Sequence, residues 1–178
     1  FYNAFHYTVD PATEKLNYDQ IMALAKQGKP KVIVAGFTSY PWTPDWQAFR
    51  AIADEVGAYL LADVSHIAGL IAAGELPSPV GIADVVSFTT HKTLCGPRGA
   101  VLIAHDRELG EKIDKGVFPG EQGGPHVNVM AAMALAFKLA KTESFKEMSR
   151  QTIRNAGAFA DAFKQNGIRV PYDGTDTH

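Results

Sequence analysis

The feature that most constrains the fold is an alternation of short apolar runs with longer segments of helical periodicity. The apolar runs are rich in valine, isoleucine, leucine and alanine, which is typical of strands buried in a sheet. They cover residues 31–36, 59–63, 83–88 and 100–104. Because strands that alternate with helices form βαβ units, the pattern predicts an α/β fold with a mostly parallel sheet and crossover helices.

Helical patterns fill several of the intervals between and after these runs. The expected helices cover about 18–27, the segment from the cap Asp45 to Gly57, the segment from 125 to about 141, and 144–165. Residues 142–144 are interpreted as a hinge, so residues 1–141 are assigned to a large domain. Residues 142–178 are assigned to the start of a smaller α/β domain, in which residues 168–170 (IRV) begin a strand.

Composition and charge exclude several classes of protein. A hydrophobic content of 46% over 178 residues suits a globular domain, and no targeting peptide is visible at the start. The most apolar tract, 58–74, is interrupted by Asp63, Ser65 and His66, so no transmembrane segment is expected. The single Cys95 cannot form an internal disulfide, and a net charge of −2 provides no positive excess for nucleic acid. We expect a cytoplasmic enzyme.

Three polar side chains stand at or just beyond the ends of expected strands: Thr38, Asp63 and Lys92. Because the ligand crevice of an open α/β sheet lies at the carboxyl ends of its strands, we expect these side chains to converge. A lysine amine can form an imine with the aldehyde of pyridoxal 5'-phosphate (PLP), and a carboxylate can keep the pyridine nitrogen protonated. Segment 88–94 carries little charge besides Lys92, which favours a partly desolvated, nucleophilic amine.

Four motifs that follow one another along the chain resemble those of serine hydroxymethyltransferases. Residues 89–99 (TTHKTLCGPRG) are similar to the TTTHKTLxGPRGG signature, and residues 62–74 (ADVSHIAGLIAAG) to a DxxHxAGLxAxG segment. Residues 118–125 (FPGEQGGP) and 36–40 (GFTSY) resemble FPGxQGGP and GxSAY. The resemblance spans most of the chain, which makes it far more specific than a lone lysine motif.

The resemblance implies a fold and a reaction. The implied fold is that of fold type I PLP-dependent transferases, the aspartate-aminotransferase-like fold, with helices on both faces of the sheet. The implied reaction is the reversible conversion of L-serine and tetrahydrofolate to glycine and 5,10-methylenetetrahydrofolate, with PLP as cofactor. The family further implies a homodimer or homotetramer, and neither nucleic acid nor membrane is an expected partner.

The resemblance also implies a role for each matching residue in the cofactor site. Lys92 stands at the Schiff-base lysine, and Asp63 at the partner of the pyridinium nitrogen. Thr38 replaces a family serine near the phenolic oxygen of the cofactor and keeps its hydroxyl. His66 stands at the active-site histidine beside that serine.

Further positions carry implied roles around the lysine and the phosphate. His91 controls reaction specificity and Thr89 lies near the reacting centre. Arg98 supports the lysine loop, while Gly123 and Gly124 offer backbone amides to the cofactor phosphate of the neighbouring subunit. Glycines suit that task because their backbone can approach an anion closely.

The same residues, taken one at a time, have plain structural interpretations. Without its motif, Lys92 would be interpreted as an ordinary exposed lysine, and Asp63 as a helix cap. His66 and His91 alone are core histidines, and neither forms a metal-ligand cluster in the sequence, so no metal is expected. Gly123 and Gly124 alone are a turn before a helix.

Departures from the family pattern leave the reactive groups in place. They are residues 41–44 (PWTP), Cys95 and Ala100. The departures concern sub-family and substrate preference. Two alternatives stay open: another PLP enzyme of the same fold, such as a threonine aldolase or an α-methylserine hydroxymethyltransferase, and a catalytically silent scaffold. An aldolase needs no folate, so folate dependence separates the first alternative from the main hypothesis.

Overall fold

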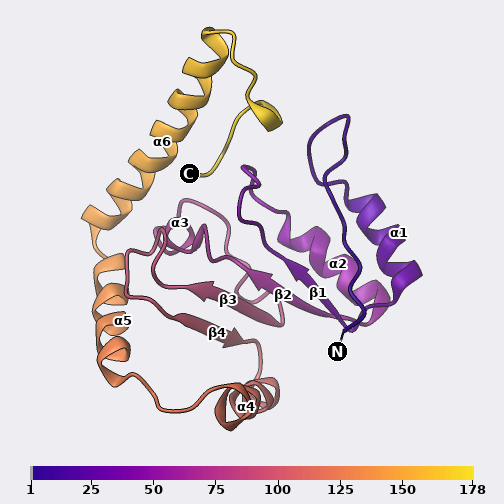
Figure 1. The fold of residues 1–178 in the computed structure, drawn as a ribbon, viewed down its shortest axis with the longest axis vertical. Helices are drawn as coiled ribbons and strands as arrows, with labels where there is room; N and C mark the ends of the chain where they lie inside the picture. Colours follow the sequence, from indigo (N-terminus) through magenta and orange to yellow (C-terminus); the bar gives the residue numbers. More distant parts are fainter. Residues whose placement is uncertain (1) are drawn as a thin grey trace.

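A four-stranded sheet in the order β1-β2-β3-β4 forms the centre of the computed structural model, which describes residues 2–178 (Figure 1). The strands are β1 (Val32–Ala35), β2 (Tyr59–Asp63), β3 (Val85–Thr89) and β4 (Ala100–Ala104). The first three are parallel, whereas β4 is antiparallel to β3. The expected α/β fold with a mostly parallel sheet is therefore confirmed, and each apolar run overlaps one strand.

Helices connect and flank the strands. They are α1 (Tyr18–Gly28), α2 (Trp46–Val56), α3 (Ala68–Ala72), α4 (Arg107–Lys115), α5 (Val127–Ala140) and α6 (Glu143–Gln165), with short irregular turns η1 (Gly116–Glu121) and η2 (Pro171–Asp173). The Asp45 carboxylate accepts a hydrogen bond from the Ala48 amide at 3.0 Å, which confirms the expected cap of α2. Within the described residues, no helix is both long and apolar enough to cross a membrane.

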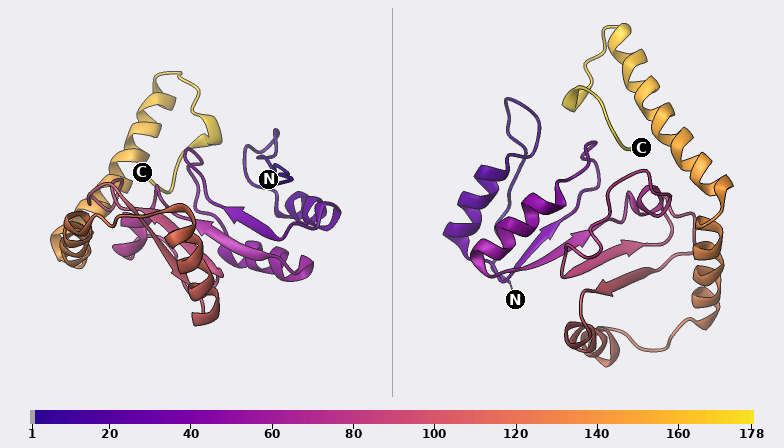
Figure 2. Two further views of the ribbon diagram at one scale, coloured as in Figure 1. Left: turned by 60° about the horizontal axis from the view of Figure 1, so that its bottom comes forward. Right: turned by 180° about the vertical axis from the view of Figure 1, so that it is seen from behind.

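The main hydrophobic core lies between one face of the sheet and the helices α1 and α2 (Figure 2). The strand register aligns Ile33 of β1 with Leu60 of β2, and both pack with Phe49 and Ile52 of α2. Burying a side chain of this size contributes about 1.5–3 kcal/mol. This cluster therefore fixes β1 beside β2 and sets the position of their carboxyl ends.

The opposite face of the sheet is approached by α4 at Ala104 and is largely open across the described part of the chain. Val32, Val34, Tyr59 and Leu102 point to this face and are 49%, 50%, 51% and 45% exposed. We call these four residues the open sheet face. Helices thus lie on both faces, as expected, but one face is covered far less than the other.

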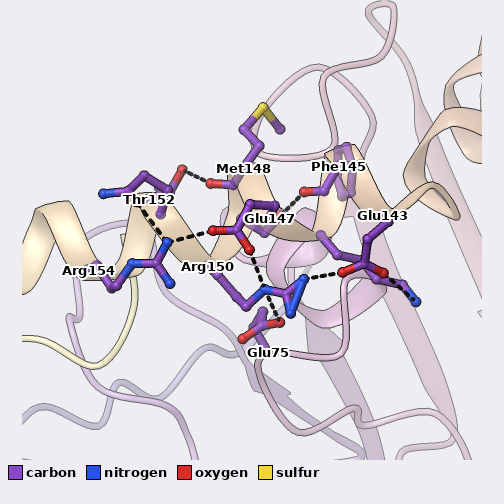
Figure 3. Close-up of polar contacts among 11 residues, drawn as sticks. Glu75, Glu143, Phe145, Glu147, Met148, Arg150, Thr152 and Arg154 are labelled. Atoms are coloured by element: carbon purple, nitrogen blue, oxygen red, sulfur yellow. Dashed lines mark hydrogen bonds and ion pairs between the residues drawn. The ribbon is translucent and has the colours of Figure 1, made fainter.

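Helix α6 extends beyond the sheet and is fastened at its start. The Thr142 hydroxyl accepts a hydrogen bond from the Phe145 amide at 3.3 Å and caps the helix. Arg150 forms an ion pair with Glu147 of the same helix at 3.1 Å, and a longer one at 3.7 Å with Glu75, which follows α3 (Figure 3). These contacts join α6 to α3, and the division into two domains at residue 142 stays a prediction.

Residues 168–170 form no strand, so the expectation of a strand there was wrong. A strand is stabilised by a neighbour that pairs with its backbone, and within residues 2–178 no other strand adjoins this segment. The Ile168 amide instead donates to the Phe163 carbonyl at 3.0 Å and closes the end of α6. Local β propensity was therefore insufficient to form a strand.

Candidate active site

Two neighbouring parallel strands bring the acid and the lysine to the same edge of the sheet. Asp63 is the last residue of β2, and it lies in register with Ser87 of β3. β3 ends at Thr89, and Lys92 follows three residues later. Asp63 and Lys92 therefore follow neighbouring strand ends at one edge of the sheet, and their expected convergence with Thr38 on one site stays a prediction.

A chain of hydrogen bonds runs between these two strand ends. The Asp63 carboxylate accepts from the Ser65 amide at 2.9 Å, and the Ser65 hydroxyl accepts from the Thr89 amide at 3.1 Å. The Thr89 hydroxyl in turn accepts from Nζ of Lys92 at 2.9 Å. Ser65 was missed as a site residue, although its position two residues after an aspartate is typical of a turn closed by a carboxylate.

The loop that carries Lys92 is held rigidly. Thr90 is fully buried, its hydroxyl donates to the Pro97 carbonyl at 2.5 Å, and its carbonyl accepts from the Gly96 amide at 2.7 Å. The loop therefore closes on itself around a buried threonine. A site built on such a loop keeps its side chains in a defined place, because buried polar groups with satisfied partners resist rearrangement.

Thr93 ties the lysine loop to the beginning of α3. Its hydroxyl donates to the His66 carbonyl at 2.8 Å and accepts from the Gly69 amide at 3.0 Å. A Cβ added at Gly69 would lie only 2.1 Å from the Thr93 carbonyl oxygen, so the two segments touch through backbone. Glycine is required there for the loop and the helix to approach each other.

The charged and titratable side chains of this site are Asp63, Lys92 and His66. Within residues 2–178 neither Asp63 nor Lys92 forms a salt bridge, and Lys92 is bonded to a neutral hydroxyl. Burial lowers the pKa of His66 below its ordinary value, the positive charge of Lys92 lowers it further, and Asp63 opposes the change. The His66 imidazole is therefore neutral at pH 7.

Two further predicted residues border this region. Nδ1 of His91 is buried and lacks a hydrogen-bond partner across the described residues. Thr38 is exposed and lines a cleft of about 360 Å³ with Tyr7, Gly36 and Tyr40 among its walls. This cleft adjoins the acid, because a Cβ added at Gly36 would lie 2.1 Å from the Asp63 carbonyl oxygen. Asp63 and Lys92 are not among its lining residues.

The remaining predicted residues lie outside this cluster. Arg98 is exposed, and no hydrogen bond or ion pair joins its side chain to another residue of the described chain. Gly123 and Gly124 are exposed between η1 and α5, where an added Cβ would meet no atom within 4 Å. Their implied contact with a phosphate of a neighbouring subunit stays a prediction.

Comparison with known proteins places the chain in a family. The model of the serine hydroxymethyltransferase family matches residues 1–178. The chain belongs to the serine hydroxymethyltransferase family. It is 53% identical to a serine hydroxymethyltransferase of a Synechococcus strain, 52% to one of a Cyanothece strain and 51% to one of Prochlorococcus marinus. All of the chain is aligned in each case, but it spans only 41–42% of the length of these serine hydroxymethyltransferases.

Proposed function

We propose that the protein containing this chain is a PLP-dependent serine hydroxymethyltransferase. It would interconvert L-serine and tetrahydrofolate with glycine and 5,10-methylenetetrahydrofolate. The observation that carries the proposal is the pair formed by Asp63 and Lys92, which stand at neighbouring strand ends and are linked through Ser65 and Thr89. Membership of the serine hydroxymethyltransferase family supports the choice of reaction.

The residues present fit PLP as the cofactor. Lys92 would hold it covalently through Nζ, and Asp63 would face its ring nitrogen and keep that nitrogen protonated. When bound, PLP supplies an electron-accepting ring for bond cleavage at the Cα atom of the amino acid. An amine and a carboxylate that do not neutralise each other in a salt bridge remain available for these two roles. The unsatisfied Nδ1 of His91 is consistent with a site that receives a polar group.

Among the described residues, no carboxylate forms a salt bridge with Lys92, so its amine is available for a bond to the cofactor. The Thr89 hydroxyl accepts a hydrogen bond from Nζ at 2.9 Å and orients the amine without an ionic bond. Neutral His66 adds no positive charge beside the amine. The Thr89 hydroxyl and the lysine loop together position the amine.

The other residues have supporting roles in this proposal. Thr38 and His66 would contact the phenolic oxygen of the cofactor, and Arg98 would support the lysine loop. The backbone amides of Gly123 and Gly124 would bind the phosphate of the cofactor held by a neighbouring subunit. This contact requires at least a homodimer. The protein would act in the cytoplasm on serine, glycine and tetrahydrofolate.

A comparison of two lysine variants tests the proposal in the full-length protein. Lys92→Ala should lower the rate of methylenetetrahydrofolate formation by more than about a hundredfold, because the covalent anchor is lost. Lys141→Ala, an exposed lysine beyond α5, should leave the rate unchanged. Borohydride treatment followed by peptide mass analysis should find the reduced cofactor on Lys92. An unchanged rate in Lys92→Ala, or glycine formation that needs no folate, would contradict the proposed reaction.

A further inference from the structure

The last residues of the chain return from the far end of α6 toward the candidate active site (Figure 1). They are anchored on the loop that follows β1. The indole of Trp42 donates to the Tyr172 carbonyl at 3.1 Å, and the Thr43 amide donates to the Asp176 carboxylate at 2.8 Å. The Asp176 amide donates to the Pro41 carbonyl at 3.1 Å. The position of this segment is therefore set by several bonds from a different part of the fold.

The anchored segment places one imidazole ring against another. Thr177 is 2% exposed and its hydroxyl donates to the Pro41 carbonyl at 3.3 Å, which fixes the direction of the next residue. The ring of His178 stacks on the ring of His66, with centroids 6.1 Å apart and planes inclined by 23°. Stacked aromatic pairs have centroids about 4.5–7 Å apart, so the rings are within stacking range.

The stack with His178 orients the His66 imidazole, which no hydrogen bond to its ring nitrogens does in the described part of the chain. Among residues 2–178, neither ring nitrogen of His66 makes a hydrogen bond; its backbone carbonyl alone accepts one, from Thr93. The imidazole would otherwise be free to rotate about its side-chain bonds beside Asp63 and Lys92. The neighbouring ring restricts that rotation.

The charges around the two rings favour the stack at neutral pH. Loss of solvent lowers the pKa of His178, and the proximity of His66 lowers it further. The pKa of His66 is likewise lowered, by burial and by Lys92, against the influence of Asp63. Both rings are therefore neutral at pH 7, and no repulsion between cations opposes their contact.

We propose that His178 is a positioning residue, which holds the imidazole of His66 in place beside Asp63 and Lys92. This inference rests on the proposed PLP site. It adds to that site a residue from the segment after η2 that does not itself touch the cofactor. His178 keeps much of its own surface exposed, so its replacement leaves the core of the fold intact.

Two variants of His178 separate the contribution of its aromatic ring from that of its nitrogen atoms. His178→Ala removes the ring, and His178→Phe keeps an aromatic ring without nitrogen atoms. In the full-length protein we expect His178→Ala to weaken PLP binding about three- to tenfold, the worth of one aromatic pair, and His178→Phe to restore most of the affinity. His105→Ala, an exposed histidine beyond β4, serves as the control and should change nothing.

Nuclear magnetic resonance of labelled histidines provides a readout that needs no activity. In cofactor-free protein, His178→Ala should shift the His66 ring resonance and raise the His66 pKa toward its ordinary value, whereas His105→Ala should do neither. Unchanged His66 resonances and titration in His178→Ala would overturn the inference, even if PLP binds normally. If wild-type protein binds no PLP while the resonances shift as expected, the positioning contact stands and the proposed function fails.

Should His178→Ala unfold the protein, Asp176→Ala provides a second route. It removes the bond to the Thr43 amide without altering either imidazole. We expect the His66 resonance to broaden or shift in the same direction as in His178→Ala, because the anchored segment loosens. A His66 resonance identical to that of wild type would count against the proposal.

Discussion

Asp63 is the residue at which charge matters most in the proposed site. Its Oδ1 atom accepts a hydrogen bond from the Ser65 amide at 2.9 Å, and no salt bridge with another described residue neutralises it. With no ionic partner among the described residues, this carboxylate is available to a bound cation. The proposed partner of that charge is the protonated ring nitrogen of PLP.

Asp63→Asn isolates this charge because asparagine keeps the size and one acceptor oxygen. We expect PLP to remain attached to Lys92 but turnover to fall by more than about a hundredfold, since a neutral amide cannot keep the ring nitrogen protonated. Borohydride trapping measures attachment, and the serine-dependent rate measures turnover. Asp114→Asn on α4 is the matched control. Normal turnover in Asp63→Asn would remove the assigned role.

Gly69 shows how an element depends on one small residue. Gly69→Ala places a Cβ 2.1 Å from the Thr93 carbonyl, so α3 and the lysine loop must separate. We expect the free energy of unfolding to fall by about 1–3 kcal/mol, as in other overpacked sites. The same change at Gly157 in α6, where an added Cβ meets no atom within 4 Å, should instead stabilise by about 0.5–1 kcal/mol. Urea unfolding of both variants measures this difference, and equal effects would contradict the proposed contact.

Asp84 joins β3 to β2 and α2, and its titration predicts a loss of stability in acid. Its carboxylate accepts from Arg50 at 2.7 Å and from the Leu60 amide at 2.6 Å. Burial alone would raise its pKa, but these bonds outweigh burial and lower the pKa below 3.8. The stabilisation is therefore complete above about pH 3.8 and is lost as the pH falls through the lower pKa of the folded state.

Replacing Asp84 should remove its contribution to the loss of stability in acid. In Asp84→Asn we expect the free energy of unfolding to be lower at neutral pH and to change less between about pH 4 and pH 2 than in wild type. Asp54→Asn is the control, because Asp54 contacts the same arginine but is 66% exposed and screened by water. Denaturant unfolding at several pH values measures the slopes, and identical slopes for Asp84→Asn and wild type would refute the assignment.

The open sheet face governs the behaviour of the isolated 178-residue chain. Large exposed apolar patches bind hydrophobic dyes and promote association. We expect the isolated chain to enhance the fluorescence of anilinonaphthalene sulfonate and to self-associate in sedimentation. Val34→Lys combined with Leu102→Lys should reduce both signals, whereas Val127→Lys at the start of α5, outside the open sheet face, should not. Unchanged dye binding in the double variant would show that this face is not the binding surface.

The fold was predictable from the sequence wherever neighbouring residues alone specify an element. Apolar runs located β1 to β4, and the rule for carboxyl ends of parallel strands placed Asp63 and Lys92 at the same edge of the sheet. Ser65 and Thr93 were missed because their partners Thr89 and His66 lie 24 and 27 residues away. The strand expected at residues 168–170 failed for the same reason, since strand formation depends on a distant neighbour.

The docking of the C-terminal segment on the Pro41–Thr43 loop has a consequence for biosynthesis. The amide of Thr43 bonds to a carboxylate 133 residues further along the chain. At about 5–20 residues per second, a ribosome needs on the order of ten seconds to make that partner. During this interval the strands can already assemble, while the polar groups of the loop after β1 form hydrogen bonds with water alone. The Pro41–Thr43 loop therefore reaches its final shape only after Asp176 has been made.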